Sequence, residues 1–197
     1  IDGVLAHFKE FKSYCFISAT PIPEVFKPTI FNGIPEHIAD WNEVDDITVY
    51  PYHTDKPYMI AAQFIKVYQT KGFLNVNGKE SKEAYFFINS VREIKDILKQ
   101  TQLTEDDYRI ICADNDKNRM TLKGYTISSS TDTSKKFNFI TSKSFEGVDF
   151  HSESGICFVV SNVQNRHTLV SIDMDIPQIA GRIRTKTNPF RNKIVHI

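Results

Sequence analysis

Short runs of apolar, β-branched and aromatic residues recur along the chain, and longer stretches with apolar positions at helical spacing lie between them. Such runs, bounded by turn residues, are typical of buried strands, whereas the longer stretches are typical of helices. The runs predict strands over residues 14–18, 47–50, 85–88, 109–112, 137–141, 156–161 and 193–197. The stretches predict helices over residues 4–11, 59–71, 91–100 and 176–184. Because the two kinds alternate, the pattern predicts an α/β fold with a mostly parallel sheet flanked by helices.

Turn-forming residues divide the chain into parts. Half of the eight prolines precede residue 46, together with the pair Asn32-Gly33. This clustering favours an irregular connector over packed secondary structure. We therefore expect a first segment over residues 1–22, which ends a preceding ATP-binding domain or forms a linker, a connector over 23–44, and one compact domain over 45–197. Because the chain begins at Ile1 rather than Met and ends on a predicted strand, we expect both ends to be cuts in a longer protein.

Composition narrows the classes of protein. The 24 basic and 24 acidic side chains cancel, so any contact with nucleic acid depends on a local patch rather than on net charge. No apolar run approaches the roughly 18 residues that a membrane span needs, and we expect no membrane partner. Cys15, Cys112 and Cys157 stand singly, without metal-binding spacing. We expect them to be reduced core thiols of a cytoplasmic protein.

Four segments carry residue types suited to contact with phosphate, at the ends of predicted strands or on the helices that follow. In chain order they are Ser18-Ala19-Thr20-Pro21, Phe86-Phe87-Ile88-Asn89-Ser90, Thr141-Ser142 with Phe145-Glu146-Gly147-Val148-Asp149, and Gln178-Ile179-Ala180-Gly181-Arg182-Ile183-Arg184. Ligands of open parallel sheets bind beyond the carboxyl ends of the strands, so the polar residues of the two middle segments are expected along one edge. Hydroxyls, amides and a close-approach glycine hold a phosphodiester backbone without identifying its bases. The alternative is that Ser90, Ser142 and Gly147 only cap helices and form turns.

The content and order of these segments resemble motifs III, IV, V and VI of superfamily 2 DNA and RNA helicases, over residues 14 to 184. The resemblance implies a RecA-like domain of the P-loop NTPase type, the second motor domain of a helicase. It implies that Ser18, Ala19 and Thr20 couple the ATP site to the nucleic-acid site. The implied contacts with nucleic acid are Asn89, Ser90, Thr141 and Ser142, and the implied contacts with the nucleotide are Gly147, Asp149 and Gly181.

The last segment has the residues best suited to phosphoryl transfer, because arginine is costly to bury and matches a transferring phosphate. On a helix over 176–184, Gln178, Gly181 and Arg182 share one face. The resemblance implies that Arg182 is an arginine finger facing an open cleft and that Gln178 belongs to the same network. A second arginine is expected three residues later, where this chain has Thr185. The nearest substitute, Arg184, is about 200° around an ideal helix from Arg182, so both face one phosphate only if the helix ends there. The alternative is a solvated basic helix end.

Two features of an ATP-binding half are missing from the sequence. Residues 72–79 have one residue too many between their glycines for a phosphate-binding loop, and Glu80 stands where a hydroxyl is needed. Asp45 and Asp46 precede a predicted strand instead of ending one. We therefore expect ATP and Mg²⁺ to be bound mainly by an upstream RecA-like domain, with no metal site and no ATP hydrolysis in this chain alone.

These observations favour the C-terminal motor domain of an ATP-dependent helicase or translocase, a hydrolase whose partners are single-stranded DNA or RNA and the upstream domain. The alternative is a catalytically inactive RecA-like domain that binds nucleic acid or serves as a scaffold. The altered position of the second arginine favours this alternative.

Overall fold

A computed structural model of the chain describes residues 5, 7–18, 22, 24–39, 46–145 and 148–197. The chain divides into two compact units, residues 1–44 and 45–197, and each is described by itself. The predicted first segment and connector fall in the first unit. Whether residues 1–22 end an ATP-binding domain stays a prediction.

The first unit has three short 3-10 turns, η1 Phe8–Glu10, η2 Glu24–Phe26 and η3 Thr29–Phe31. The prediction of a strand over residues 14–18 is wrong, because these residues have no regular secondary structure and Ile17 is 92% exposed. Their aromatic rings instead surround Phe8, with Tyr14 and Phe16 at centroid distances of 4.7 and 5.0 Å. Cys15 is exposed, so the expectation of a core thiol is also wrong there. The predicted helix over 4–11 is reduced to helical backbone at residues 5 and 7 and to η1.

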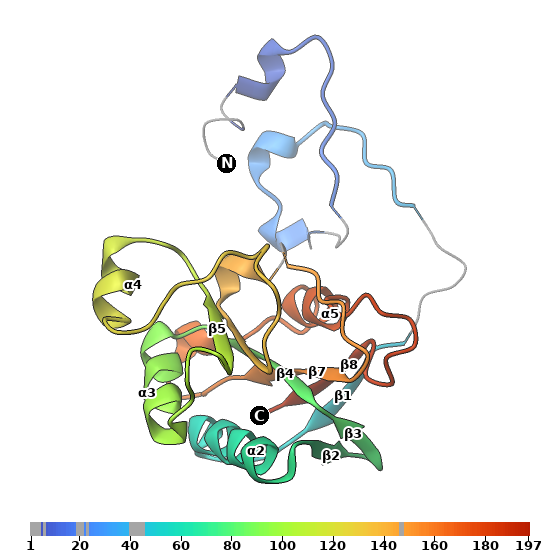
Figure 1. Cartoon of the computed structure of the whole chain (residues 1–197). Coiled ribbons are helices and arrows are strands. Elements are labelled where there is room, and N and C mark those ends of the chain that lie inside the picture. The colour runs from blue at the N-terminus through green and yellow to red at the C-terminus, as the bar shows by residue number, and fades with distance from the viewer. Residues whose placement is uncertain (1–4, 6, 19–21, 23, 40–45, 146–147) are drawn as a thin grey trace. The chain divides into compact units, whose positions relative to one another are not determined.

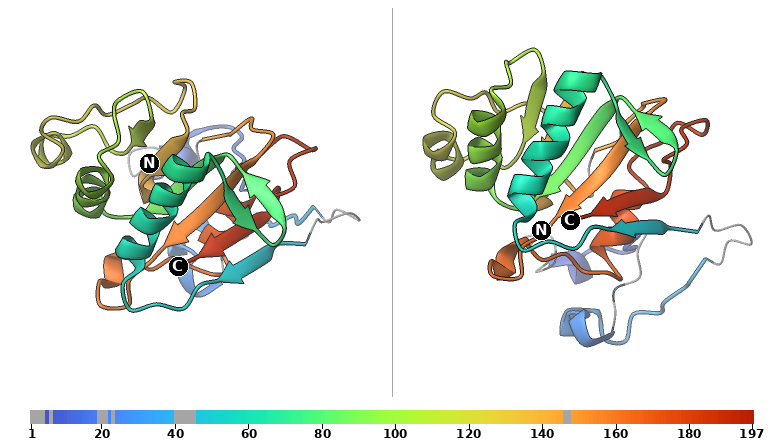
Figure 2. Two further views of the ribbon diagram at one scale, coloured as in Figure 1. Left: turned by 60° about the horizontal axis from the view of Figure 1, so that its bottom comes forward. Right: turned by 90° about the horizontal axis from the view of Figure 1, so that it is seen from below.

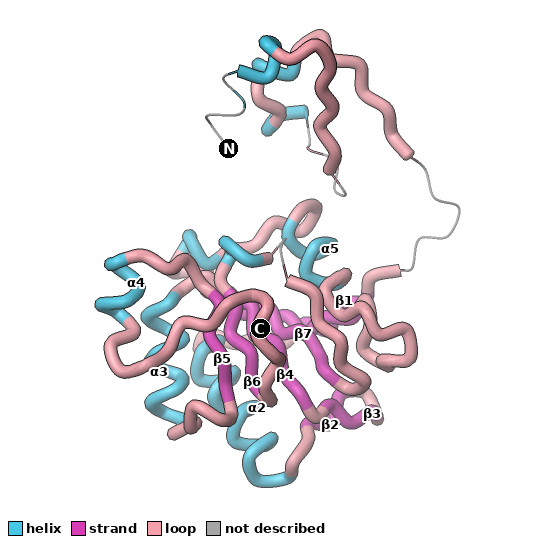
Figure 3. Tube along the Cα trace, turned by 45° about the horizontal axis from the view of Figure 1, so that its top comes forward, coloured by secondary structure: helices cyan, strands magenta, loops and turns pink. Residues whose placement is uncertain are grey.

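The second unit is built on a parallel sheet of six strands (Figure 1). In chain order the strands are β1 Thr48–Pro51, β4 Glu83–Ile88, β5 Tyr108–Ile111, β6 Phe137–Ile140, β7 Gly155–Val160 and β8 Lys193–His196. Their order across the sheet is β1-β8-β7-β4-β6-β5, and every pairing is parallel. Figure 3 shows β5, β6, β4 and β7 side by side in this sheet. The predicted α/β fold with a mostly parallel sheet is confirmed, and six of the seven predicted strands are present.

Helices cover both faces of this sheet. On one face lie α2 Pro57–Lys71 and α3 Val91–Thr101, which supply apolar side chains to the larger core (Figure 2). On the other face, α5 Asp175–Ala180 packs with the segment that follows β6 to form the smaller core. A fourth helix, α4 Asp116–Thr121, follows β5. Residues of β4 alternate between the two cores, which explains why its sequence is continuously apolar.

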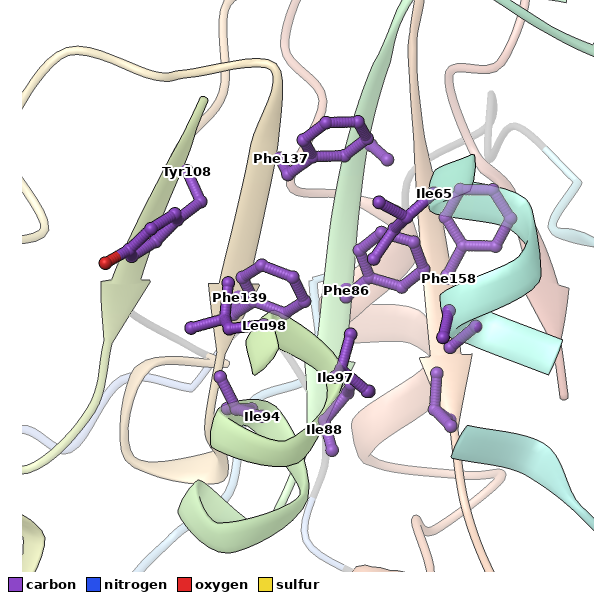
Figure 4. Close-up of a cluster of buried hydrophobic side chains, with 14 of the residues drawn as sticks. Ile65, Phe86, Ile88, Ile94, Ile97, Leu98, Tyr108, Phe137, Phe139 and Phe158 are labelled. Atoms are coloured by element: carbon purple, nitrogen blue, oxygen red, sulfur yellow. The ribbon is translucent and has the colours of Figure 1, made fainter. Parts of the chain in front are cut away.

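Three phenylalanines form a row across the central strands in the larger core (Figure 4). Phe86 on β4 is in register with Phe139 on β6 and Phe158 on β7. The ring of Phe86 is stacked on both neighbours, at centroid distances of 5.5 and 4.8 Å. Offset stacking adds to the stabilisation from burial. The row therefore fixes the register of the strands whose ends carry the predicted site.

Residues 72–79, which do not match a phosphate-binding loop, have a structural role instead. Gly72 ends α2 in the left-handed region, with φ of 83°. Residues after it form an antiparallel hairpin, β2 Leu74–Val76 and β3 Lys79–Ser81. Its turn is Asn77-Gly78, with φ of 48° and 78°, the conformation for which this dipeptide is favoured. This hairpin was not predicted from the sequence.

Helix α5 is shorter than predicted. It ends at Ala180, four residues before the predicted end at 184. The backbone beyond it pairs with a distant segment, since Phe150 N donates to Arg182 O at 2.8 Å and Arg184 N donates to Phe150 O at 2.9 Å. These hydrogen bonds replace the helical ones. Asp175 is the first residue of α5 and its carboxylate accepts from Ser171 N at 2.7 Å, whereas the N-cap residue, Met174, makes no side-chain cap hydrogen bond.

Candidate functional site

Two predicted residues meet beyond the carboxyl ends of neighbouring strands. Asn89 follows β4 and Ser142 follows β6, and the Ser142 hydroxyl donates to Asn89 Oδ1 at 2.7 Å. The amide of Asn89 donates to the carbonyl of His167 at 2.6 Å, in the loop after β7. Ser142 is exposed and Asn89 is half-buried, so a hydroxyl and an amide lie at this edge of the sheet. Such groups are suited to a phosphate oxygen.

The other two predicted nucleic-acid contacts have structural partners. Ser90 caps α3, and its hydroxyl accepts from Glu93 N at 3.4 Å. Thr141 is buried, and its backbone N–H donates to Ile111 O at 3.0 Å, extending the pairing of β6 with β5. Both lie at the expected edge. The capping alternative therefore describes Ser90 correctly, and Thr141 presents little surface to a ligand.

A single carboxylate joins the two arginines of the last motif. Asp149 Oδ1 lies 2.9 Å from Arg184 Nε and 3.6 Å from Arg182 Nη1. On a continuous helix these arginines would diverge, but α5 ends at Ala180 and the chain then runs beside Phe150. Two guanidinium groups therefore converge on one anionic group. Residues two apart on an ideal helix lie about 200° apart, so Arg182 and Arg184 can both reach Asp149 only because the helix ends before them.

Arg182 does not face an open cleft, contrary to the expectation. Its relative exposure is 8%, because it folds back along α5. Its Nε donates to Gln178 O at 2.7 Å, and its Nη2 donates to Gln178 Oε1 at 3.2 Å. Burial raises the pKa of the neighbouring Cys157 thiol, and the positive charge of Arg182 opposes this rise. The predicted pairing of Gln178 with Arg182 is thus present, but the guanidinium group is buried.

Gly181 and Arg182 do not share a helical face with Gln178, because the helix ends before them. Gly181 is the C-cap of α5, and its N–H donates to Pro177 O at 3.1 Å. A Cβ built at Gly181 would lie 3.5 Å from that carbonyl oxygen, an ordinary contact. The backbone at 181 therefore does not require glycine, and nothing in its surroundings explains the residue.

Buried polar and aromatic residues contact Phe150, which follows Asp149 in the chain. The Phe150 ring stacks on Tyr85 at 4.0 Å, and the Arg109 guanidinium lies 5.7 Å from its centroid. Arg109 is 2% exposed and donates to Asn138 Oδ1 at 2.7 Å. Burial lowers the pKa of Arg109, and the charge of Asp132 opposes this shift. This cluster was not predicted from the sequence, although Arg109 and Asn138 are polar residues within otherwise apolar strands.

The remaining predicted site residues cannot be placed relative to Asn89, Ser142 and Asp149. Ala19, Thr20 and Gly147 lie outside the described residues. Ser18 is exposed in the first unit, which is not placed relative to the second.

Neither a metal-binding group among the described residues nor a comparison with known proteins assigns a role to this site. The described residues contain no group of three or more His, Cys, Asp or Glu side chains that could hold a metal ion. Within the same described part of the chain, no helix is long and apolar enough to cross a membrane. Comparison with protein families and with curated proteins finds no family model and no protein that matches this chain.

Proposed function

We propose that this chain is the second RecA-like domain of an ATP-dependent superfamily 2 helicase or translocase. A six-stranded parallel sheet with helices on both faces is compatible with such a domain. The observation that carries the proposal is the convergence of Arg182 and Arg184 on Asp149. In this function ATP and Mg²⁺ are bound mainly by a partner RecA-like domain upstream in the same protein.

The arginine pair would act on the phosphates of ATP. A γ-phosphate carries more negative charge than a carboxylate and offers more acceptor oxygens, so it competes with Asp149 for the guanidinium groups. When the two domains close on ATP, Arg184 exchanges partners first because it is half-exposed, and Arg182 follows by leaving Gln178. Charge that develops on the transferring phosphoryl group is then stabilised by arginine. Asp149, once released, is free to orient the nucleotide.

Asn89 and Ser142 would hold the nucleic acid at the carboxyl edge. Their mutual hydrogen bond keeps both polar groups satisfied without a ligand. A phosphate oxygen of single-stranded DNA or RNA can replace one partner of this pair without leaving the other buried and unpaired. Contacts of this kind carry no base information, so binding is expected to be weak and independent of sequence. Cycles of closure and release would then move the strand.

A second candidate is a RecA-like scaffold or nucleic-acid-binding domain without catalysis. The burial of Arg182 favours it, because an arginine finger that is 8% exposed must leave its pocket before it can reach a phosphate. In this candidate the Arg182, Gln178 and Asp149 contacts only stabilise the fold.

ATPase measurements on a protein that joins this chain to its phosphate-loop domain separate the two candidates. A motor domain requires hydrolysis that single-stranded DNA or RNA stimulates, and Arg182→Lys should lower it by about 10³-fold because lysine keeps the charge but not the planar fork. Arg191→Lys, which changes a partly buried arginine outside the Asp149 cluster, is the matched control. Unchanged hydrolysis in Arg182→Lys would leave the scaffold as the better proposal.

A further inference from the structure

A shallow pocket of about 320 Å³ opens between α4 and the segment that follows it. Its lining combines one aromatic and two apolar side chains with three charged ones: Tyr125, Leu122, Ile127, Asp114, Arg119 and Lys123. The pocket lies beyond the carboxyl end of β5, at the edge of the sheet where Asn89 and Ser142 meet. None of these residues was selected by the sequence motifs.

The floor of the pocket is anchored to the main core. Leu122 is buried, and Tyr125 packs partly against the core with its ring 6.1 Å from that of Tyr108. Ile127 forms a parallel bridge with Ile110 of β5. Tyr125 is half-buried and is one of the residues that line the pocket. An aromatic surface held in this way can stack on a planar ligand without losing much conformational freedom.

The walls of the pocket carry cations. Arg119 donates twice to Asp114, from Nε at 2.6 Å and from Nη2 at 2.8 Å, which neutralises the only carboxylate in the lining. Lys123 is exposed, and the contacts of the described residues include no partner for its ammonium group. The side of the pocket near Lys123 is therefore positive.

The pocket and the proposed nucleic-acid site follow neighbouring strands, β5 and β6. Hydrogen bonds from Arg119 lower the pKa of Asp114, and the charge of Lys143 lowers it further. Lys143 follows Ser142 directly in the short 3-10 turn η4 Ser142–Ser144. The strand order β4-β6-β5 places Asn89 after β4, Ser142 and Lys143 after β6, and the pocket after β5, so they follow one another along the carboxyl edge.

We propose that this pocket holds one unstacked nucleotide of the single strand, with its base against Tyr125 and a phosphate on Lys123. The inference rests on the proposed function and extends it by naming where a base, and not only the backbone, is bound. A nucleotide fits because it is the ligand that offers both a planar apolar face and an adjacent anion, and the pocket has the size of small-ligand sites. The neighbouring backbone then reaches Asn89 and Ser142 along this edge.

Fluorescence anisotropy with a fluorescein-labelled oligodeoxythymidylate of about 12 nucleotides tests this inference on the whole chain. Tyr125→Leu, which keeps the apolar packing, should weaken binding about tenfold, and Tyr125→Phe should keep it. Lys123→Gln should weaken binding several-fold and reduce the slope of log affinity against log salt by about 0.7. Lys117→Gln, which removes a charge from the exposed side of α4 outside the pocket, is the matched control and should change affinity less than twofold.

The outcomes separate the inference from the proposed function. The inference is overturned if Tyr125→Leu binds like the unchanged chain, or if Lys117→Gln and Lys123→Gln are equivalent. If Asn89→Ala weakens binding while the pocket variants do not, only the inference fails. If the unchanged chain binds no oligonucleotide, the proposed nucleic-acid contact fails with it. Circular dichroism of each variant checks that the fold is kept, and photocrosslinking of a 5-iodouracil oligonucleotide to residue 125 gives support independent of affinity.

Discussion

At the scale of single residues, Arg182 and Arg184 differ in burial although both pair with Asp149. The Arg182 side chain is 9% exposed, whereas those of Arg184 and Asp149 are each 47% exposed. An exposed ion pair contributes little to stability, because water solvates both charges about equally well in the folded and the unfolded state. A buried arginine is costly unless its hydrogen bonds are satisfied, and its aliphatic stem packs against apolar neighbours. The two positions should therefore respond differently to truncation.

Arg182→Ala should lower the free energy of unfolding by about 2 kcal/mol, because it removes packed methylene groups and the donors bound by Gln178. A loss of this size is not expected of an arginine that faces an open cleft. Arg184→Ala should cost less than about 1 kcal/mol. Urea denaturation of the two variants measures both values, and equal losses would show that the burial of Arg182 has been misjudged.

A pH dependence is expected from His196 at the end of β8. Burial lowers the pKa of His196 below its usual value, and its Nε2 lies 2.7 Å from the Ser161 hydroxyl. The folded state therefore favours the neutral ring. Its contribution to stability is fully present above the unfolded pKa of about 6.5 and is lost as pH falls from there through the lower folded pKa.

Urea denaturation at about pH 7.5 and about pH 5.5 tests this prediction. The unchanged protein should lose more stability on acidification than His196→Gln, which has no imidazole to protonate. Groups that titrate in both proteins cancel in this comparison. The same loss in both proteins would mean that His196 is not responsible for the pH dependence.

At the scale of elements, the sequence predicted best those strands that are buried on both faces. Runs such as residues 85–88 are apolar throughout because β4 faces a core on each side. The run at 14–18 has similar composition but lacks a neighbouring strand in the described residues, so it forms no sheet. Helix α4 was not predicted because it buries no residue and thus has no apolar stripe.

The candidate site was predictable in part for the same physical reason. Strand ends follow from local pattern, so Asn89 and Ser142 could be expected at one edge. The early end of α5 depends on hydrogen bonds between Phe150 and residues 182 and 184, which are far apart in sequence. Local periodicity contains no information on that pairing. The burial of Arg182 and its contact with Asp149 were therefore not predictable from spacing alone.

Ser90 allows the capping role and the binding role to be separated. Ser90→Ala should destabilise the protein by about 1 kcal/mol because α3 loses its cap. Ser90→Asp keeps a capping oxygen and should retain stability, but its charge should weaken oligodeoxythymidylate binding several-fold at low salt if the strand passes this edge. Thermal unfolding and anisotropy on the same samples give both results. Unchanged affinity in Ser90→Asp would place the strand elsewhere.

At the scale of the whole molecule, the two units differ in how they bury apolar surface. Residues 45–197 enclose both cores of the sheet, and their central strands are almost wholly buried. The first unit has few buried side chains and exposes large apolar ones, among them Phe11, Ile17, Val25 and Ile38. A domain that encloses its own core is expected to fold alone.

A chain limited to residues 45–197 should therefore fold and unfold cooperatively without the first unit. Its sheet and both cores are complete within these bounds, so the urea midpoint of its main transition should match that of the full chain. Binding of the dye 8-anilinonaphthalene-1-sulfonate should be weaker than in the full chain, because the exposed apolar side chains of residues 1–44 are removed. Oligodeoxythymidylate affinity should persist, since Asn89, Ser142 and Tyr125 all lie in the retained unit. A shorter chain that unfolds without cooperativity, or with stability lower by more than about 2 kcal/mol, would show that residues 1–44 complete the core of the sheet domain.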